Sequence, residues 1–466
     1  MITILLDHIS FGTGRKYRQI MRGIQAALSA GALRPGDRLP PQRELANALG
    51  VTMGTVTRAY REIDKLGLVK GEIGRGTFVV GPEAEEFTLH ALHNRAYPET
   101  ADWIRFDLNF PVPEGTPDLA AMLAELSHQP GLKEMTRYQP TAGIIRHRRT
   151  ACKWLEKLNL STSPEHLAIT TGAQHALLTA LCSQMAPGDA LAVDGYTYPG
   201  IINLAGVLNL RLVPVESDAA GMVPEALEKA CGRHRLKGVY LMPTIHNPTT
   251  VTMNPDRRRE LAAAISRLDL FLIEDDVYGG MEPEAMTPIA AIIPERSFYL
   301  TSLSKTLAPG LRLGFLVVPN GQLPAVERVM AASIWMNPPL IAEIGSRWIE
   351  NGTADHAVII KRRFAEKRMA ILAGKLSACD LRFRPGSLHA WLKLPLPWTG
   401  ETFARQASRM GVQVIPSANF STKGRQLVEA VRICIGPPKN EAETARGAQI
   451  LSDILAKPAV NDMPFM

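Results

Sequence analysis

Hydrophobic positions follow a helical spacing near the start of the chain and form short apolar runs further on. Apolar residues three to four positions apart predict helices over about residues 17–28, 41–49 and 55–66. Gly50 stands where the second of these should end, because glycine commonly terminates helices. The first part of the chain is therefore expected to be a small helical module.

A β-hairpin is expected after the third helix. Apolar stretches flank Gly71 and Gly76, where glycine permits a tight turn. Two helices joined by a short turn and followed by a hairpin form a winged helix-turn-helix, which we assign to residues 1–80. Over residues 81–102 the hydrophobic period is lost, which indicates a linker.

Beyond the linker, apolar runs alternate with helical segments. The runs are LAIT, ALAVD, RLVPV, GVYLMP, LFLIEDD, SFYLTS and GFLVVP. Continuous apolar runs are typical of buried parallel strands, so we expect a large α/β domain with a mainly parallel sheet over residues 103–352. Helices and shorter strands then predict a small C-terminal α+β domain over residues 353–466.

The net charge of +7 is concentrated at the start of the chain. Residues 1–80 hold 12 basic and six acidic side chains, which accounts for most of the excess. A basic winged helix-turn-helix predicts binding to double-stranded DNA. The alternative is a protein-interaction module whose charges form a solvated face.

Other classes are excluded by what the sequence lacks. Five scattered cysteines without a CxxC pair predict reduced thiols rather than disulfides or a metal site. No stretch reaches the roughly 18 apolar residues that a membrane helix needs, and no signal peptide is evident. We expect a cytoplasmic protein with no metal and no membrane contact.

The stretch from residue 17 to residue 80 resembles the GntR family of bacterial regulators, most clearly in GDRLPPQRELANALGVTMGTVTRAYREIDKLGLVKGEIGRGTFV. The resemblance implies DNA contacts by Arg43, Thr52, Thr55, Arg75 and Gly76. Met53 and Gly54 stand where Ser and Arg are common in the family. This departure shifts the expected base reading towards Arg58 or the wing.

The strongest chemical signal is TSLSKTLAPGLRLG, residues 301–314. A Lys just past a strand, with hydroxyls before it and an Arg after it, suits a carbonyl cofactor that bears a phosphate. Lys305 would supply the Schiff-base amine. Ser302, Ser304 and Arg312 would bind the phosphate.

Two further segments suit the same cofactor. A strand-to-helix turn, where free amides and the helix dipole bind phosphate, holds Thr171, Gly172, Ala173 and Gln174. In DGYTYPG, Tyr198 offers an aromatic face on which a planar ring can stack.

The remaining ligands lie in MPTIHNPTT and FLIEDDVYGG. Asn247 is an amide donor suited to a phenolate oxygen. A carboxylate beside a pyridine nitrogen keeps that nitrogen protonated, and we prefer Asp275 over Asp276 for this role. Tyr278 follows three residues after Asp275.

In this order, the motifs resemble the fold type I pyridoxal-5′-phosphate aminotransferases over roughly residues 103–456. The resemblance implies pyridoxal 5′-phosphate as the cofactor, with Lys305, Asp275 and Tyr198 as the catalytic residues. Asn247 and Tyr278 would bind the phenolate oxygen.

The same resemblance implies that Arg432 binds the α-carboxylate of an amino acid. Tyr138 opens a Y-x-x-x-x-G motif that reaches the phosphate of the other subunit, which implies a homodimer. Two places depart from the family pattern: Thr250 replaces a usual Gly, and Gly195 and Tyr196 replace a frequent acidic-Pro pair.

A GntR-type head on an aminotransferase-like body resembles the MocR subfamily. This implies a pyridoxal-phosphate-dependent transcriptional regulator that responds to the cofactor or to a small amino acid or amine. One alternative is an active aminotransferase for an aromatic or 2-aminoadipate-like substrate, with an accessory DNA-binding domain. Another is a vitamin B6 sensor that binds no amino acid and for which Arg432 is dispensable.

Overall fold

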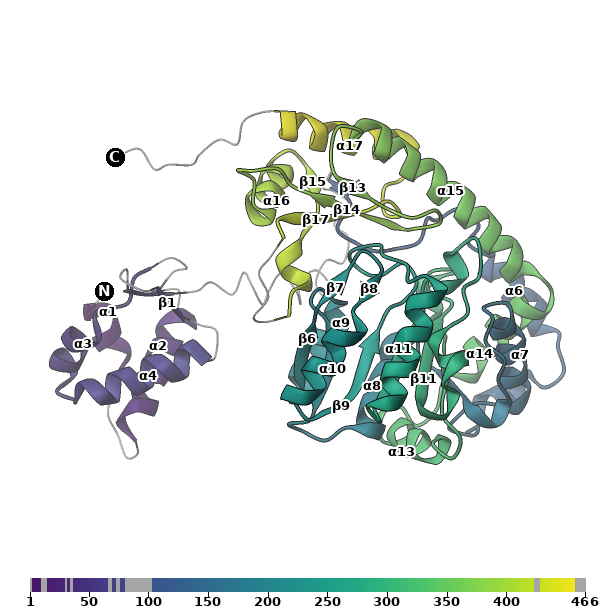
Figure 1. The fold of residues 1–466 in the computed structure, drawn as a ribbon, viewed down its shortest axis with the longest axis horizontal. Coiled ribbons are helices and arrows are strands. Elements are labelled where there is room, and N and C mark those ends of the chain that lie inside the picture. The colour runs from purple at the N-terminus through teal and green to yellow at the C-terminus, as the bar shows by residue number, and fades with distance from the viewer. Residues whose placement is uncertain are drawn as a thin grey trace. The chain divides into compact units, whose positions relative to one another are not determined.

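The computed structural model describes residues 2–9, 15–29, 32–33, 37–65, 69–72, 76–79, 103–422 and 428–456 (Figure 1). The chain forms two compact units, Met1–Glu99 and Thr100–Met466. The predicted linker, 81–102, lies outside the described residues. Within the described ranges, no helix is both long and apolar enough to cross a membrane.

The N-terminal unit is a winged helix-turn-helix, as predicted. Its described elements are α1 (Ile2–His8), α2 (Lys16–Ser29), α3 (Gln42–Leu49), α4 (Met53–Lys65), β1 (Val69–Glu72) and β2 (Gly76–Val79). The strands pair antiparallel. Ile20, Ile24, Leu45, Val56 and Ile63 are fully buried in the common core. Their helical spacing is the pattern from which the helices were predicted.

Two details of this unit differ from the sequence pattern. The third predicted helix, α4, begins at Met53, two residues earlier than expected. The short helix α1 was not predicted, because a seven-residue helix gains its stability from packing rather than from its own periodicity. It packs closely on α2: a Cβ on Gly23 would lie 2.3 Å from Cγ1 of Ile9.

The second unit is built on a seven-stranded sheet with the order β4-β12-β11-β10-β9-β5-β6. The strands are β4 (Leu167–Thr170), β5 (Ala190–Asp194), β6 (Arg211–Val215), β9 (Leu236–Leu241), β10 (Phe271–Asp275), β11 (Ser297–Ser302) and β12 (Gly314–Val317). Each predicted apolar run forms one of them.

The sheet is mainly parallel, as predicted, and β12 is the exception. This strand runs antiparallel to both β11 and β4. A parallel connection needs a crossover of a dozen or more residues, usually a helix. Residues 303–313 contain only the short 3-10 helix η5 (Pro309–Leu311), so the chain turns back instead.

Helices cover both faces of this sheet. Leu191 and Val193 of β5 join one hydrophobic core, whereas Ala190 and Ala192 join another. Because successive strand residues face opposite sides, a strand covered on both sides reads as one apolar run. The helices of the large domain are α6 (Leu119–Ser127), α7 (Ile145–Glu156), α8 (Ala173–Gln184), α9 (Pro199–Val207), α10 (Pro224–Arg233), α11 (Pro255–Arg267), α12 (Ile289–Ile292), α13 (Leu323–Ser333) and α14 (Pro339–Glu350).

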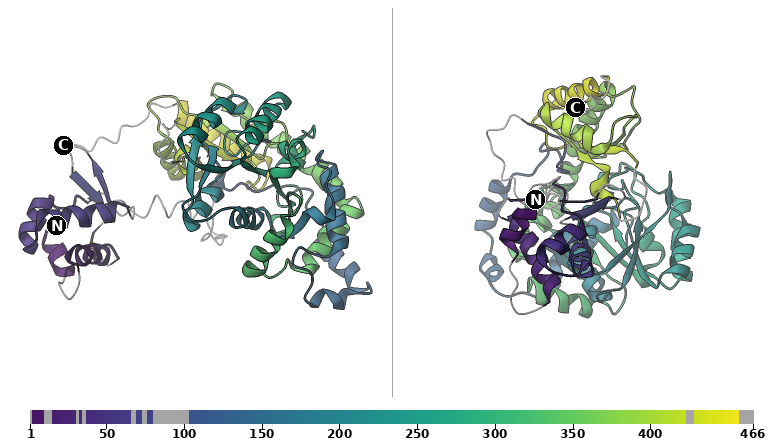
Figure 2. Two further views of the ribbon diagram at one scale, coloured as in Figure 1. Left: turned by 60° about the horizontal axis from the view of Figure 1, so that its bottom comes forward. Right: turned by 90° about the vertical axis from the view of Figure 1, so that its left-hand side faces the viewer.

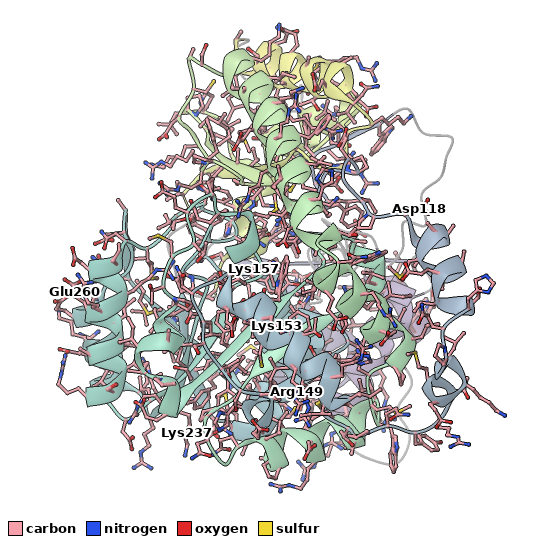
Figure 3. All side chains as sticks on the ribbon, turned by 90° about the vertical axis from the view of Figure 1, so that its right-hand side faces the viewer. Asp118, Arg149, Lys153, Lys157, Lys237 and Glu260 are labelled. Carbon is pink, nitrogen blue, oxygen red and sulfur yellow. The ribbon has the colours of Figure 1, made fainter. Side chains whose placement is uncertain are left out.

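The helix α7 shows the two-sided character of these covering helices. It buries Trp154 and Leu155, while Arg149, Lys153 and the following Lys157 project outwards (Figure 3). Lys157 Nζ lies 2.6 Å from the carboxylate of Asp355, at the start of the next lobe. The helix thus packs on the domain through its apolar face and carries charged residues on its outer face.

A smaller C-terminal lobe follows α14; the right-hand view of Figure 2 shows it, coloured green to yellow, above the sheet. Its sheet has the order β13-β14-β17-β16. The elements are α15 (Thr353–Lys375), β13 (Leu381–Arg382), β14 (His389–Lys393), α16 (Gly400–Arg409), β15 (Val412–Gln413), β16 (Ile415–Pro416), β17 (Ala430–Cys434) and α17 (Glu441–Ala456).

The first strand of the second unit pairs with a strand of this lobe. The strand β3 (Ile104–Arg105) pairs in parallel with β15. The sequence pattern gave no sign of this pairing. A two-residue strand leaves no periodic signal in a sequence.

Candidate cofactor site and DNA-binding surface

Lys305 lies in the turn that follows β11. Its Nζ donates a hydrogen bond to the backbone carbonyl of Asn109 and lies 5.8 Å from the ring centre of Tyr278. Burial removes the amine from water and lowers the pKa of Lys305 to about 8. A larger fraction of Lys305 is therefore neutral at physiological pH than of an exposed lysine. The neutral amine is the form that adds to a carbonyl.

The strand β10 leads into two buried acids with different partners. Asp275 accepts a hydrogen bond from the Tyr240 hydroxyl at 2.8 Å, and Lys305 is among the charges that act on it. Asp276 accepts one from the Tyr299 hydroxyl at 2.7 Å. Burial raises the pKa of Asp275 to about 7. A cationic ring nitrogen beside Asp275 would favour its ionised form.

Residues 171–174 comprise the turn after β4 and the first two residues of α8. Gly172 caps α8 with a φ of +82°, and a Cβ there would lie 2.5 Å from the Arg312 guanidinium. The missing side chain lets Arg312 lie against the turn, beside the first amides of α8. Free amides at a helix N-terminus with an adjacent guanidinium suit a phosphate.

The two predicted phosphate-binding serines lie close to this turn. Ser302 pairs with Gly314 across β11 and β12. A Cβ on Gly314 would lie 2.7 Å from the carbonyl carbon of Gly172, so the strand end adjoins the turn. The backbone N–H of Ser304 donates to Ser302 Oγ at 3.4 Å.

Tyr198 directly precedes α9 and contacts the turn as well. Its hydroxyl donates to Oε1 of Gln174 at 3.1 Å. A Cβ on Gly200 would lie 2.2 Å from the Tyr198 ring, so the ring packs against bare backbone. Burial raises the pKa of Tyr198 to about 12, which keeps the hydroxyl protonated.

Arg432 on β17 connects the C-terminal lobe to the large domain. Its Nη1 donates to Oδ1 of Asn247 at 2.9 Å, and its Nη2 donates to the backbone carbonyl of Asp107 at 2.9 Å. The guanidinium lies 4.8 Å from the ring centre of Phe420. Because Arg432 occupies the amide oxygen, the amide nitrogen of Asn247 is left to donate to another acceptor.

Asn109 is a site residue that the sequence analysis missed. Its side-chain amide donates to the Tyr278 hydroxyl at 2.6 Å, and its carbonyl accepts from Lys305. These partners are 169 and 196 positions away along the chain. No local pattern marks a contact of that separation, so only the fold reveals it.

Tyr138 is the one predicted cofactor ligand that is placed elsewhere. It is 82% exposed, and its ring meets that of Trp335 edge-on, with 6.1 Å between the centroids. Its expected contact with the phosphate of a partner subunit stays a prediction.

The residues around Lys305 fit pyridoxal phosphate. They combine a buried amine, a buried acid, an aromatic ring and a glycine turn beside a guanidinium. Two buried polar atoms in this region, Asn109 Oδ1 and Arg432 Nε, have no hydrogen-bond partner among the described residues. A bound polar group would satisfy such atoms.

In the N-terminal unit, four of the predicted DNA contacts lie on α3, on α4 or in the turn between them. Arg43 is exposed in the first turn of α3. Thr52 precedes α4, and its hydroxyl lies 2.9 Å from that of Thr55. The exposed Arg58 has its guanidinium 4.3 Å from the ring centre of Tyr17, so it also connects α4 to α2.

In the wing, Gly76 packs against an arginine that was not predicted. Gly76 has a φ of +121°, and a Cβ there would lie 2.6 Å from Arg38 Nε. Arg38 is exposed and pairs through its backbone with Phe78 of β2. The GDRLP string contains it. Arg75 lies outside the described residues.

Comparison with known families matches residues 102–451 to aminotransferase class I and II. It matches residues 16–79 to the bacterial regulatory proteins of the gntR family. Each match lies within one of the two units described above.

Two relatives are similar over most of the chain. The uncharacterized HTH-type transcriptional regulator YdeF of Bacillus subtilis (strain 168) is 29% identical over 94% of both chains. The vitamin B6 salvage pathway transcriptional repressor PtsJ of Salmonella typhimurium is 29% identical over 82% of this chain and 86% of its own.

Among solved structures, kynurenine aminotransferase of Pyrococcus horikoshii, in complex with PMP, superposes with a TM-score of 0.73. It is 24% identical, and the match covers 81% of this chain and 94% of that one. This likeness supports the fold of the body.

Proposed function

The chain belongs to the aminotransferase class I and II family and carries a GntR-family DNA-binding domain, and from this premise we propose that it is a pyridoxal-phosphate-dependent transcriptional regulator of the MocR type. The head binds double-stranded DNA in the cytoplasm, where the chromosome lies. The body senses the cofactor, or an amino compound, through Lys305. The observation that carries the proposal is the buried Lys305 site, with Asp275 and Arg432, in a chain that begins with a basic winged helix-turn-helix.

The residues of the body have distinct tasks in holding the cofactor. When bound, pyridoxal phosphate supplies an aldehyde and an electron-accepting ring. Lys305 would offer a neutral amine to the aldehyde, and Asp275 would keep the ring nitrogen protonated. Residues 171–174 and Arg312 would bind the phosphate. Tyr198 would offer its aromatic face to the ring.

Arg432 is the proposed receptor for the carboxylate of an effector. Its two terminal nitrogens now donate to Asn247 and to the Asp107 carbonyl. A carboxylate bound in a bidentate pair would compete for these donors. Because Arg432 belongs to the C-terminal lobe and Asn247 to the large domain, this competition would shift the lobe and thereby bias the head.

The relative PtsJ is named a transcriptional repressor of the vitamin B6 salvage pathway. For this chain, one variant of the proposal is that the ligand is a B6 compound alone, without an amino acid. In that variant Arg432 is dispensable. An unchanged response to ligand in Arg432→Ala would select that variant.

We also propose a homodimer. Tyr138 and Trp335 form an aromatic pair whose members are 82% and 59% exposed. Large aromatic side chains are enriched at protein interfaces. In a dimer, Tyr138 would complete the phosphate site of the partner subunit.

Turnover as an aminotransferase is the second candidate. The observation that favours it is that Lys305, Asp275 and Arg432 belong to one connected site, which is the minimum that transfer of an amino group requires. Steady formation of a keto acid from an amino acid would support it.

The proposal is tested by two measurements on the full-length protein. Added pyridoxal phosphate should give a protein-bound visible absorbance band that Lys305→Ala lacks. The protein should shift DNA from upstream of its own gene most strongly at low salt, where contacts to phosphates are least screened. Absence of the band would refute the cofactor role, and absence of binding at low salt would refute the regulator role.

A further inference from the structure

A cavity of about 230 Å³ opens between the large domain and the C-terminal lobe. Its lining includes Asp194 at the end of β5, His246 in the loop after β9 and Trp391 of β14. None of the residues assigned above to the cofactor lines it. We propose that this cavity is a separate binding site for a small alkylamine, held as a cation by Asp194.

Asp194 is a buried carboxylate whose negative charge is compensated by few nearby groups. It is 5% exposed, and its Oδ1 accepts a hydrogen bond from the Ser217 hydroxyl at 2.6 Å. Its Oδ2 lies 3.7 Å from Nε2 of His246, beyond hydrogen-bond distance. Among the described residues, no Lys or Arg forms an ion pair with Asp194. A buried carboxylate in this state favours a cationic partner.

His246 does not supply that cation. It is 6% exposed, and burial lowers the pKa of its imidazole, which keeps the ring neutral. Nδ1 lies 2.8 Å from the Thr249 hydroxyl. Nε2 is buried and has no hydrogen-bond partner in the described part of the chain. The most buried part of the lining therefore combines an under-compensated carboxylate with an unsatisfied imidazole nitrogen.

The charged residues at the rim already have partners. Arg382 and Lys393 both contact the carboxylate of Asp380. Asp218 forms an ion pair with Arg257, 2.8 Å between Nη2 and Oδ2. The Asp218–Arg257 pair is neutral, whereas Arg382 and Lys393 share the single carboxylate of Asp380 and keep one net positive charge. Arg382 and Lys393 are 50% and 36% exposed, so water and salt screen their charge more than that of the buried Asp194. The buried carboxylate therefore determines the charge of the preferred ligand.

The walls are suited to an apolar body attached to the amine. Met242, Val251 and Met253 line one part. Tyr196 and Trp391, whose ring centroids are 5.7 Å apart, line another. A short branched or straight alkyl chain would replace water against these side chains.

The cavity is connected to both lobes, which suits an effector site. The Tyr196 hydroxyl bonds to the backbone of Val428 in the C-terminal lobe. His246 precedes the cofactor residue Asn247, and its carbonyl lies 3.3 Å from Nε2 of His389. A ligand here would therefore affect the relative stability of lobe positions without touching Lys305. This regulatory role rests on the proposed function; the binding itself does not.

The test uses two probes with the same alkyl body and opposite charge. They are N,N-dimethylisoamylamine, a tertiary amine that cannot condense with a carbonyl cofactor, and isocaproate. Calorimetric titration of the full-length, cofactor-loaded protein should show one amine bound per chain and no binding of isocaproate. Asp194→Asn, which keeps the shape and the Ser217 hydrogen bond, should weaken amine binding at least about tenfold.

Two further variants complete the design. Asp269→Asn, which removes an exposed carboxylate that does not line the cavity, should bind the amine as the wild type does. Val251→Phe, which fills the cavity from its apolar side, should also lose binding, and it serves if Asp194→Asn does not fold. Equal affinity in wild type and Asp194→Asn, or equal binding of isocaproate, would overturn the proposal. The visible band and DNA binding of Asp194→Asn report separately on the proposed function and should be unchanged.

Discussion

Burial moves the two ionisable groups of the cofactor site towards neutrality: the pKa of Lys305 falls to about 8 and that of Asp275 rises to about 7. Both residues could be predicted from sequence, because each stands beside the end of an apolar run. Asn109 and Arg38 could not. Asn109 contacts Lys305, and Arg38 contacts Gly76, because folding brings together residues that are far apart in the sequence.

The lowered pKa of Lys305 predicts how cofactor uptake depends on pH. Only the neutral amine attacks a carbonyl, so the rate of appearance of the visible band should rise with pH, with a midpoint near pH 8. Stopped-flow mixing of cofactor-free protein with pyridoxal phosphate measures this rate. A midpoint above about pH 10, as for a solvated lysine, would contradict the burial argument.

The raised pKa of Asp275 predicts a pH-dependent effect of Asp275→Asn on cofactor-free protein. A native pKa above the unfolded one means that the wild type loses stability as pH rises towards about 7. The variant, which resembles the protonated acid, should therefore become more stable than the wild type above pH 7, by up to about 4 kcal/mol. Urea unfolding at several pH values measures the gap. A difference in unfolding free energy between the variant and the wild type that does not change with pH would contradict this prediction.

At the scale of elements, the sequence predicted all seven strands of the large sheet, because each reads as an apolar run, including the edge strand β6, which has two exposed residues. It did not predict the direction of β12, the helix α1 or the pairing of β3 with β15. The direction of a strand depends on the length of the connection that precedes it. The stability of a very short element depends on packing. Neither leaves a periodic signal.

The turn into α8 predicts a steric effect on cofactor binding. In Gly172→Ala, the new Cβ would meet the Arg312 guanidinium at 2.5 Å and would disturb the phosphate site. We expect at least tenfold weaker binding of pyridoxal phosphate, about 1.4 kcal/mol or more. Gly188→Ala is the matched control, because Gly188 also has a positive φ but no atom within 4 Å of its Cβ position. Equal loss in both variants would indicate backbone strain rather than a phosphate site.

The recognition elements of the head predict a salt-dependent effect. Arg43→Ala should weaken DNA binding and reduce the slope of log affinity against log salt by about 1, because one phosphate contact is lost. Arg22→Ala removes the same charge from the exposed face of α2 and should leave the slope unchanged. Fluorescence anisotropy at several salt concentrations measures both. An unchanged slope in Arg43→Ala would remove that residue from the interface.

At the scale of the whole molecule, charge and motif order in the sequence predicted a DNA-binding unit and a cofactor-binding body. Six of the seven excess positive charges lie in the first 80 residues. The sequence could not predict how the units communicate, because coupling is a difference in ligand affinity between two states. Contacts within one unit, such as that of Arg432 with Asn247, identify where such a difference could arise.

The central claim is that cofactor binding in the body changes the affinity of the head for DNA. The most direct test is the dissociation constant for DNA from upstream of the protein's own gene, measured at one low salt concentration without and with saturating pyridoxal phosphate. The account predicts a change of at least about fivefold in the wild type and a much smaller change in Lys305→Ala. The same dissociation constant in both conditions would contradict it.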